Sequence, residues 1–161
     1  MDGVLGGTIL VNGAPWPVLE VSNTRYRFRI LNASNARRYE LALQPGNAPF
    51  VQVGSDGGLL GAPIPHRTIP IAQAERLDVV VDFSKYDVGG EVTLKNRMSE
   101  DRTADVMRFR VTNTENDMSS RNPTPTARAC FALPGSATRE ERCGRSTAKR
   151  STRGTWPPVR S

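Results

Sequence analysis

The chain has 161 residues, enough for one domain of ordinary size, and a formal net charge of +6. No stretch approaches the roughly 18 consecutive apolar residues of a membrane-spanning helix, so no membrane partner is expected. The first residues lack the basic and apolar regions of a secretory signal, which makes the cytoplasm the default location.

Short apolar blocks and turn signals alternate from the start of the chain. Residues 8–11 are apolar and rich in β-branched side chains, and Asn12-Gly13 after them is a strong turn signal. Residues 18–21 form a second short strand pattern, for which Pro17 suits the first position or a sheet edge.

The clearest pattern covers residues 25–43. Tyr26, Phe28 and Ile30 alternate with arginines, which is typical of a half-buried strand because successive side chains point to opposite faces. Residues 32–35 interrupt the alternation with short polar side chains that favour a turn, and it resumes a few residues later. We therefore expect a hairpin of two strands joined by a compact turn.

The rest of the body has the same character. The prolines of residues 61–70 make that stretch a loop or a sheet edge. Further strand patterns cover residues 50–53, 76–83, 91–95 and 105–111. Because the strands are short and no amphipathic helix is present, the pattern predicts an all-β sandwich or barrel in residues 1–112.

Alternation also predicts the core, since side chains of one parity share one face of a strand. The predicted core consists of Tyr26, Phe28, Ile30, Tyr39, Leu41, Leu77, Val79, Val81, Phe83, Met107 and Phe109.

Five motifs in this body resemble multicopper oxidases, in particular the spore-coat laccase and bilirubin oxidase branch. They are GTILVNG (7–13), WPVLEV (16–21), YRFRILNASNAR (26–37), QVGSDGGLL (52–60) and AERLDVVVDF (74–83). The resemblance covers residues 5–112 and is to the second of three cupredoxin domains. It implies a cupredoxin-like Greek-key β-sandwich within an enzyme that oxidises phenolic or bilirubin-type donors and reduces dioxygen. The partners it implies are the missing first and third cupredoxin domains, and it allows a spore-coat location.

Copper is the cofactor that the resemblance implies for the parent enzyme. A blue-copper site takes two histidines and one cysteine, and the family builds its trinuclear cluster from His-x-His pairs in the first and third domains. The chain has one histidine, His66, and no His-x-His pair. We therefore expect His66 to be an exposed loop side chain, and the chain to have no catalytic, cofactor-binding or metal-binding residue and no bound copper.

Other candidate sites have simpler structural interpretations. Asp78 and Asp82 share a strand face and lie four positions apart, about 13 Å along a strand, which favours a charge-balanced outer face over an acid–base pair. The pair Glu75-Arg76 favours a surface ion pair, and Trp16 and Tyr26 favour packing over substrate contact. The glycines of 54–58 are turn signals, because neither the lysine nor the helix of a phosphate-binding loop follows them.

The character of the sequence changes at residue 113. Residues 1–112 carry 13 Lys+Arg against 12 Asp+Glu, whereas residues 113–161 carry 9 against 4, with five prolines and no alternation. Such a segment favours disorder, so its removal should not change the unfolding of the body, and a frameshifted reading of the gene is an alternative origin. Cys130 and Cys143 have no histidine partner for a metal site, although a disulfide between them stays open. The arginines are scattered, which disfavours nucleic acid as a partner.

Two classes of function follow. In the first, the chain is the structural middle domain of a laccase-like oxidase and is inactive alone. In the second, it is a free-standing cupredoxin-like module with a structural or interaction role, such as a coat-type protein.

Overall fold

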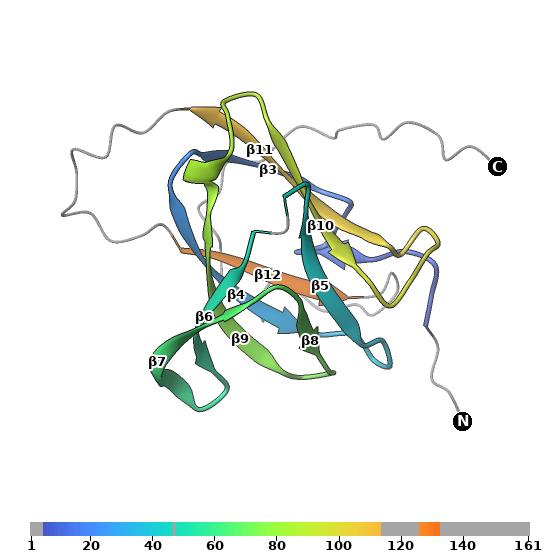
Figure 1. Ribbon diagram of the computed structural model, residues 1–161. Coiled ribbons are helices and arrows are strands. Elements are labelled where there is room, and N and C mark those ends of the chain that lie inside the picture. Colours follow the sequence, from blue (N-terminus) through green and yellow to red (C-terminus); the bar gives the residue numbers. More distant parts are fainter. Residues whose placement is uncertain (1–4, 47, 114–125, 133–161) are drawn as a thin grey trace.

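A computed structural model describes residues 5–46 and 48–113 in full and the backbone of residues 126–132 (Figure 1). Apart from one turn of 3-10 helix, η1 (Phe83–Lys85), the regular structure in these residues consists of strands, which confirms the all-β prediction. In chain order the strands are β1 (Leu10–Val11), β2 (Ala14–Pro15), β3 (Val18–Ser22), β4 (Arg25–Asn32), β5 (Tyr39–Gln44), β6 (Phe50–Ser55), β7 (Gly58–His66), β8 (Ile69–Ile71), β9 (Arg76–Asp82), β10 (Glu91–Asn96), β11 (Asp105–Asn113) and β12 (Thr126–Ala132).

The strands form two sheets. One has the order β2-β1-β12-β4-β9-β6-β7, and the other has the order β3-β11-β10-β5-β8. The pairs β3–β11 and β4–β12 are parallel, and the other pairs are antiparallel. Buried side chains from both sheets form one hydrophobic cluster, so the sheets pack face to face as a sandwich. No helix in the described part of the chain is long and apolar enough to cross a membrane.

The predicted core parity is confirmed. Nine of the eleven predicted side chains are buried, and the other two, Tyr26 and Leu77, are half-buried against the same cluster. Phe28, Phe83 and Phe109 form its aromatic centre, with ring centroids 5.1 to 6.3 Å apart. Aromatic pairs at this spacing add attraction beyond the apolar area that they bury.

The predicted hairpin in residues 25–43 is wrong. The strands β4 and β5 lie where the alternation placed them, but β4 pairs with β9 and β12 in one sheet, and β5 pairs with β8 and β10 in the other. A period of two residues is the same for a strand that turns back on its neighbour and for one that crosses to the opposite sheet. The alternation therefore identified the strands without identifying their partners.

The side chain of Asn32 explains why the chain crosses between the sheets at this point. Asn32 is fully buried; its Nδ2 donates to the carbonyls of Arg37 (2.9 Å) and Ile71 (3.2 Å). Its Oδ1 accepts a hydrogen bond from the Ser34 N–H at 3.0 Å. Since these bonds satisfy the buried side chain of Asn32 and tie the start of the link to Ile71, the chain can leave β4 at the end of one sheet and enter the other.

The proline-rich stretch at residues 61–70 lies at sheet edges, one of the two places predicted for it. Strand β7 is the last strand of the larger sheet, and β8 is the last strand of the smaller sheet. Edge positions tolerate proline because the missing N–H need not bond to a neighbouring strand.

The prediction that residues 113–161 lack strand structure is wrong for Thr126–Ala132. This segment forms β12, which runs parallel to β4 and antiparallel to β1, as Figure 1 shows in orange. Strands pair through hydrogen bonds between backbone groups, so a segment without alternating apolar side chains can still join a sheet. The side-chain pattern therefore did not predict this strand. The rest of the predicted tail after residue 113, including Cys143, lies outside the described residues.

Candidate functional site

His66, the histidine tested as a copper ligand, lies at the end of β7. It is half-buried, which corrects the expectation of an exposed loop side chain. Its Nε2 lies 3.0 Å from the Gln52 side-chain oxygen, so a neighbouring amide already occupies this ring nitrogen. The side chain therefore completes a local hydrogen bond between β6 and β7.

The described residues do not fit a copper site. No group of three or more histidine, cysteine, aspartate or glutamate side chains among them could hold a metal ion. A blue-copper centre needs two imidazoles and a thiolate, whereas the whole chain has one histidine. We therefore assign no step of copper chemistry to the described residues.

The two candidate carboxylates on β9 are ion-paired across the sheet to β4. Asp78 contacts Arg27 and, at 3.4 Å, Arg29, and Asp82 lies 3.3 Å from Arg25. Burial raises the pKa of Asp82, but hydrogen bonds from the Ser84 hydroxyl and N–H and the Arg25 guanidinium outweigh it, so the pKa is lowered. A charge-balanced outer face, as predicted, explains these residues.

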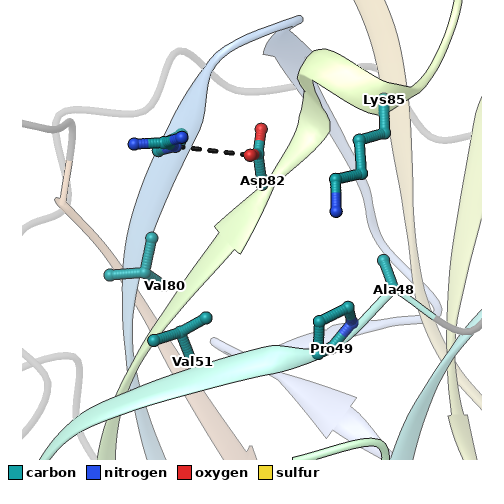
Figure 2. A pocket seen from close by; sticks show the side chains of 7 residues that line it. Ala48, Pro49, Val51, Val80, Asp82 and Lys85 are labelled. Carbon is teal, nitrogen blue, oxygen red and sulfur yellow. Dashed lines mark hydrogen bonds and ion pairs between the residues drawn. The ribbon is translucent and has the colours of Figure 1, made fainter. Parts of the chain in front are cut away.

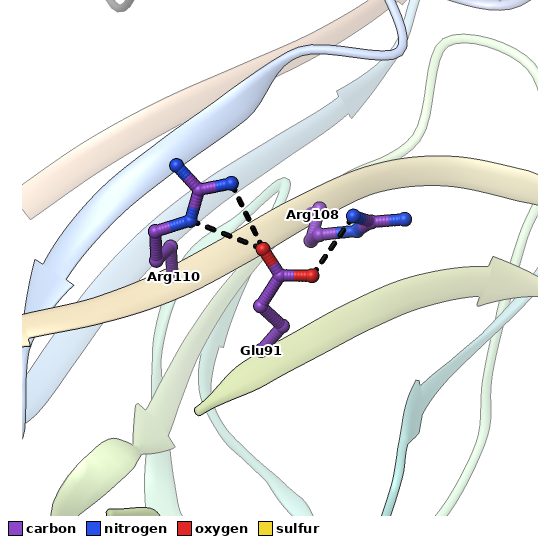
Figure 3. Close-up of polar contacts among 3 residues, drawn as sticks. All are labelled: Glu91, Arg108 and Arg110. Carbon is purple, nitrogen blue, oxygen red and sulfur yellow. Dashed lines mark hydrogen bonds and ion pairs between the residues drawn. The ribbon is translucent and has the colours of Figure 1, made fainter. Parts of the chain in front are cut away.

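The outer face of the smaller sheet carries a second charged group. Figure 3 shows Glu91 of β10 between Arg108 and Arg110 of β11. Its two carboxylate oxygens lie 2.8 Å from Arg108 Nη1 and 2.9 Å from Arg110 Nη2. These groups are partly exposed, and such pairs contribute about 0–1 kcal/mol to stability. They indicate a sheet face that is adapted to water.

The remaining candidates also have structural roles. The Tyr26 phenol oxygen accepts a hydrogen bond from the Ser22 N–H at 3.0 Å, and the ring packs against the core. Trp16 donates its indole N–H to the Arg102 carbonyl at 3.3 Å. The predicted pair Glu75-Arg76 is not the contact observed, because Arg76 instead pairs with Asp56 at 2.7 Å.

The turn at residues 54–58 joins β6 to β7 as a hairpin, in agreement with the turn prediction. A side chain at position 54 would meet backbone, because a Cβ added to Gly54 would lie 3.0 Å from the carbonyl oxygen of Gly58. The close approach of the two backbone segments at Gly54 and Gly58 therefore requires glycine at position 54.

A hollow on the outer face of the larger sheet was not foreseen. It has a volume of about 250 Å³ and is lined by Arg25, Ala48, Pro49, Val51, Val80, Asp82 and Lys85 (Figure 2). The signal in the sequence was Val80, the one apolar residue on the otherwise charged face of β9. The floor of the hollow is apolar, and its one carboxylate, Asp82, is already paired with Arg25. The hollow therefore fits contact with another molecule better than acid–base chemistry.

Comparisons with known proteins connect this fold to oxidases. No family model matches the chain. The laccase of Bacillus stratosphericus is 50% identical to it over 113 residues, which make up 66% of this chain and 22% of the laccase. The cell division protein FtsP of Edwardsiella tarda is 50% identical over 92 residues, 57% of this chain and 19% of that protein. The chain thus spans about a fifth of the length of the curated relatives that it matches.

A solved structure gives the same result. The 2F4 variant of the McoA multicopper oxidase from Aquifex aeolicus superposes with a TM-score of 0.67 and 42% sequence identity. The match covers 72% of this chain and 27% of the oxidase chain, and it confirms the cupredoxin-like β-sandwich. These sequence and structural matches show that the chain resembles one part of laccases and other multicopper oxidases.

Proposed function

We propose that this chain is the copper-free middle domain of a laccase-like multicopper oxidase, a scaffold between two copper-bearing domains and one wall of a substrate cleft. The observation that carries the proposal is a match of 50% identity that covers 22% of a laccase, in a sequence that has one histidine. High identity to an oxidase together with a lack of histidine ligands supports a structural role for this segment within the enzyme.

The chemistry of the proposed parent enzyme requires other domains. The parent would oxidise phenolic or bilirubin-type donors and pass four electrons to dioxygen, using copper held by several imidazoles and a thiolate. The first and third cupredoxin domains would supply those ligands and are the proposed partners. A spore-coat location and a frameshifted origin of residues 113–161 remain proposals that rest on the resemblance and the composition.

A domain exchange tests the proposal. The matched segment of the Bacillus stratosphericus laccase would be replaced by the corresponding segment of this chain, to give a full-length chimera. If the segment is a scaffold that needs no ligands of its own, the chimera retains copper and oxidises a phenolic donor. The control is the same laccase rebuilt with its own segment across the same junctions.

The result that would contradict the proposal is a chimera that folds but is inactive. A chimera with the β-sheet circular dichroism of the control, but without retained copper or donor oxidation, would show that this segment cannot take the middle position. The proposed function would then be wrong.

The match to a cell division protein supports a second candidate function. The chain is 50% identical to a laccase and also 50% identical to FtsP, which is named as a cell division protein and not as an oxidase. A domain of this kind can therefore belong to a protein with another role. In that case the chain is an interaction module. Sequencing the DNA on either side of the gene discriminates the two candidates: reading frames that encode His-x-His pairs favour the oxidase, and their absence favours the module.

A further inference from the structure

Four apolar side chains lie on the outer face of the larger sheet, where β9, β6 and β7 run side by side. We call this set, Val51, Leu59, Pro65 and Val80, the outer patch. Val51 lies opposite Val80 on β9 and opposite Pro65 on β7, so the three residues form one row across three strands. The row points outward, because Phe50 and Val79 beside it are buried.

Leu59 extends the row along β7. It pairs with Gly54, which in turn pairs with Asp78 on the outward side of β9. Leu59 has 75% of its surface exposed. A large apolar side chain at that exposure, on the same sheet face as the row, adds to the apolar surface at this end of the sheet.

The outer face of the smaller sheet shows what a solvated face of this protein looks like. Arg108, Arg110 and Glu91 form its ion-paired cluster (Figure 3), and Lys95 and Asp105 pair at 2.9 Å nearby. The outer face of the larger sheet also carries ion pairs, between β4 and β9, and Arg27 lies opposite Val80. The outer patch extends beyond these pairs onto β6 and β7, where Val51, Leu59 and Pro65 are uncharged. This apolar end of the face is the surface that we consider for a partner.

The hollow continues the outer patch and gives it a charge preference. Val51 and Val80 belong to both, and Figure 2 shows the Lys85 side chain extending toward Ala48 and Pro49. Asp82 is already paired with Arg25, whereas Lys85 has no ion pair within the part of the chain that the structure describes. The volume of about 250 Å³ is below the roughly 300–1,000 Å³ of small-molecule pockets. It suits one apolar side chain with a carboxylate beside it.

Strand addition is a poor way to bind at this corner. Pro63 and Pro65 carry no N–H, so β7 offers few backbone donors for a new strand at its open edge. A partner must therefore bind through the side chains of the sheet face.

Charge disfavours the two nearest alternative occupants. In a two-fold interface with a second copy, the carboxylate of the hollow that could face Lys85 is Asp82, which is already paired with Arg25. Residues 113–161 carry 9 Lys+Arg against 4 Asp+Glu and would be repelled. The partner has to present a carboxylate, which points to a different polypeptide segment.

We infer that the outer patch and its hollow dock another domain of the same oxidase polypeptide, which inserts an apolar side chain into the hollow and a carboxylate beside Lys85. This inference rests on the proposed function, in which the chain makes up about a fifth of a longer oxidase. The remaining four fifths or so of such an oxidase could supply the carboxylate that Lys85 requires.

The test uses paired substitutions in the laccase chimera. Val51→Asp places a charge in the patch, and Thr93→Asp places the same charge on the outward side of β10, where Thr93 is equally half-buried and lies opposite Arg108. We expect Val51→Asp to lower the yield of active, copper-loaded chimera at least about tenfold, because the charge would be buried unpaired. Thr93→Asp should stay within about twofold. Lys85→Glu should lower the yield at least about threefold through repulsion of the carboxylate.

Both aspartate variants would also be made in the 161-residue chain, where each should shift Tm by no more than about 3 °C. A larger shift for Val51→Asp in that chain would place Val51 inside the fold and overturn the inference. An active chimera equally tolerant of both aspartates would also overturn it. So would a free chain that forms dimers and becomes monomeric with Val51→Asp, because a second copy would then be the occupant. An inactive parent chimera would instead contradict the proposed function, and the choice of partner with it.

Discussion

The hydroxyl of Ser34 and the phenol oxygen of Tyr39 lie 2.9 Å apart and join the link after β4 in one sheet to the first residue of β5 in the other. Both residues are buried. Burial raises the pKa of the Tyr39 phenol in spite of the Ser34 hydrogen bond and the Arg37 guanidinium, so the group stays neutral. A crossing between two sheets is therefore fixed by a buried polar contact and by apolar packing together.

Tyr39→Phe tests that contact. The variant loses one buried hydrogen bond and leaves the Ser34 hydroxyl with fewer partners, so unfolding should become easier by about 1–3 kcal/mol. Urea unfolding of Tyr39→Phe, Ser34→Ala and the double variant gives the coupling between the two side chains. A coupling energy near zero would show that the contact does not help to hold the link.

Phe28→Ala tests the aromatic centre. Phe28 is 4% exposed, and its ring centroid lies 5.3 Å from that of Phe109. Removing the ring should lower the unfolding free energy by about 3–5 kcal/mol. Leu59→Ala, at an exposed position, is the control and should change it by less than about 0.5 kcal/mol. Equal effects of the two substitutions in chemical denaturation would contradict the assignment of the faces.

Alternation of side chains predicted most strand positions and the inward parity, because both follow from local geometry. It did not distinguish a hairpin from a crossing at residues 25–43, since the partner of a strand is set by distant residues such as Ile71, whose carbonyl accepts from Asn32. The outer patch was missed because Val51, Val80 and Leu59 come from three strands. Their proximity depends on the sheet order, which no local pattern contains.

The strand β12 changes the expectation for the tail. It lies between β1 and β4, so removing it would leave the edge of β4 unpaired and detach β1 and β2 from the larger sheet. A chain of residues 1–125 should therefore have a lower Tm than a chain of residues 1–132, with faster amide exchange in β4. Identical Tm values and exchange rates would restore the sequence-based expectation that the tail does not contribute.

Asp101 should make the free energy of unfolding depend on pH in the acid range. Hydrogen bonds from the hydroxyl and N–H of Thr103 and the hydroxyl of Ser99 lower the pKa of Asp101 from 3.8 to about 2. A lowered pKa means that the contribution to stability is present above about pH 4 and is lost as the pH falls to about 2.

Asp101→Asn should remove that dependence. The difference in urea midpoint between the parent chain and Asp101→Asn should be larger at about pH 5 than at about pH 2. A difference that does not change between the two conditions would show that the carboxylate is not the group responsible.

The central claim is that this domain holds no copper of its own, and metal analysis of the isolated 161-residue chain tests it most directly. The chain would be dialysed against copper and then against a mild chelator, with the Bacillus stratosphericus laccase treated in parallel as the positive control. Because one histidine cannot supply two imidazole ligands, we predict far less than one retained copper per chain, no absorption band near about 600 nm and no oxidation of a phenolic donor. One copper retained per chain, with a blue band or turnover by the chain alone, would contradict the account.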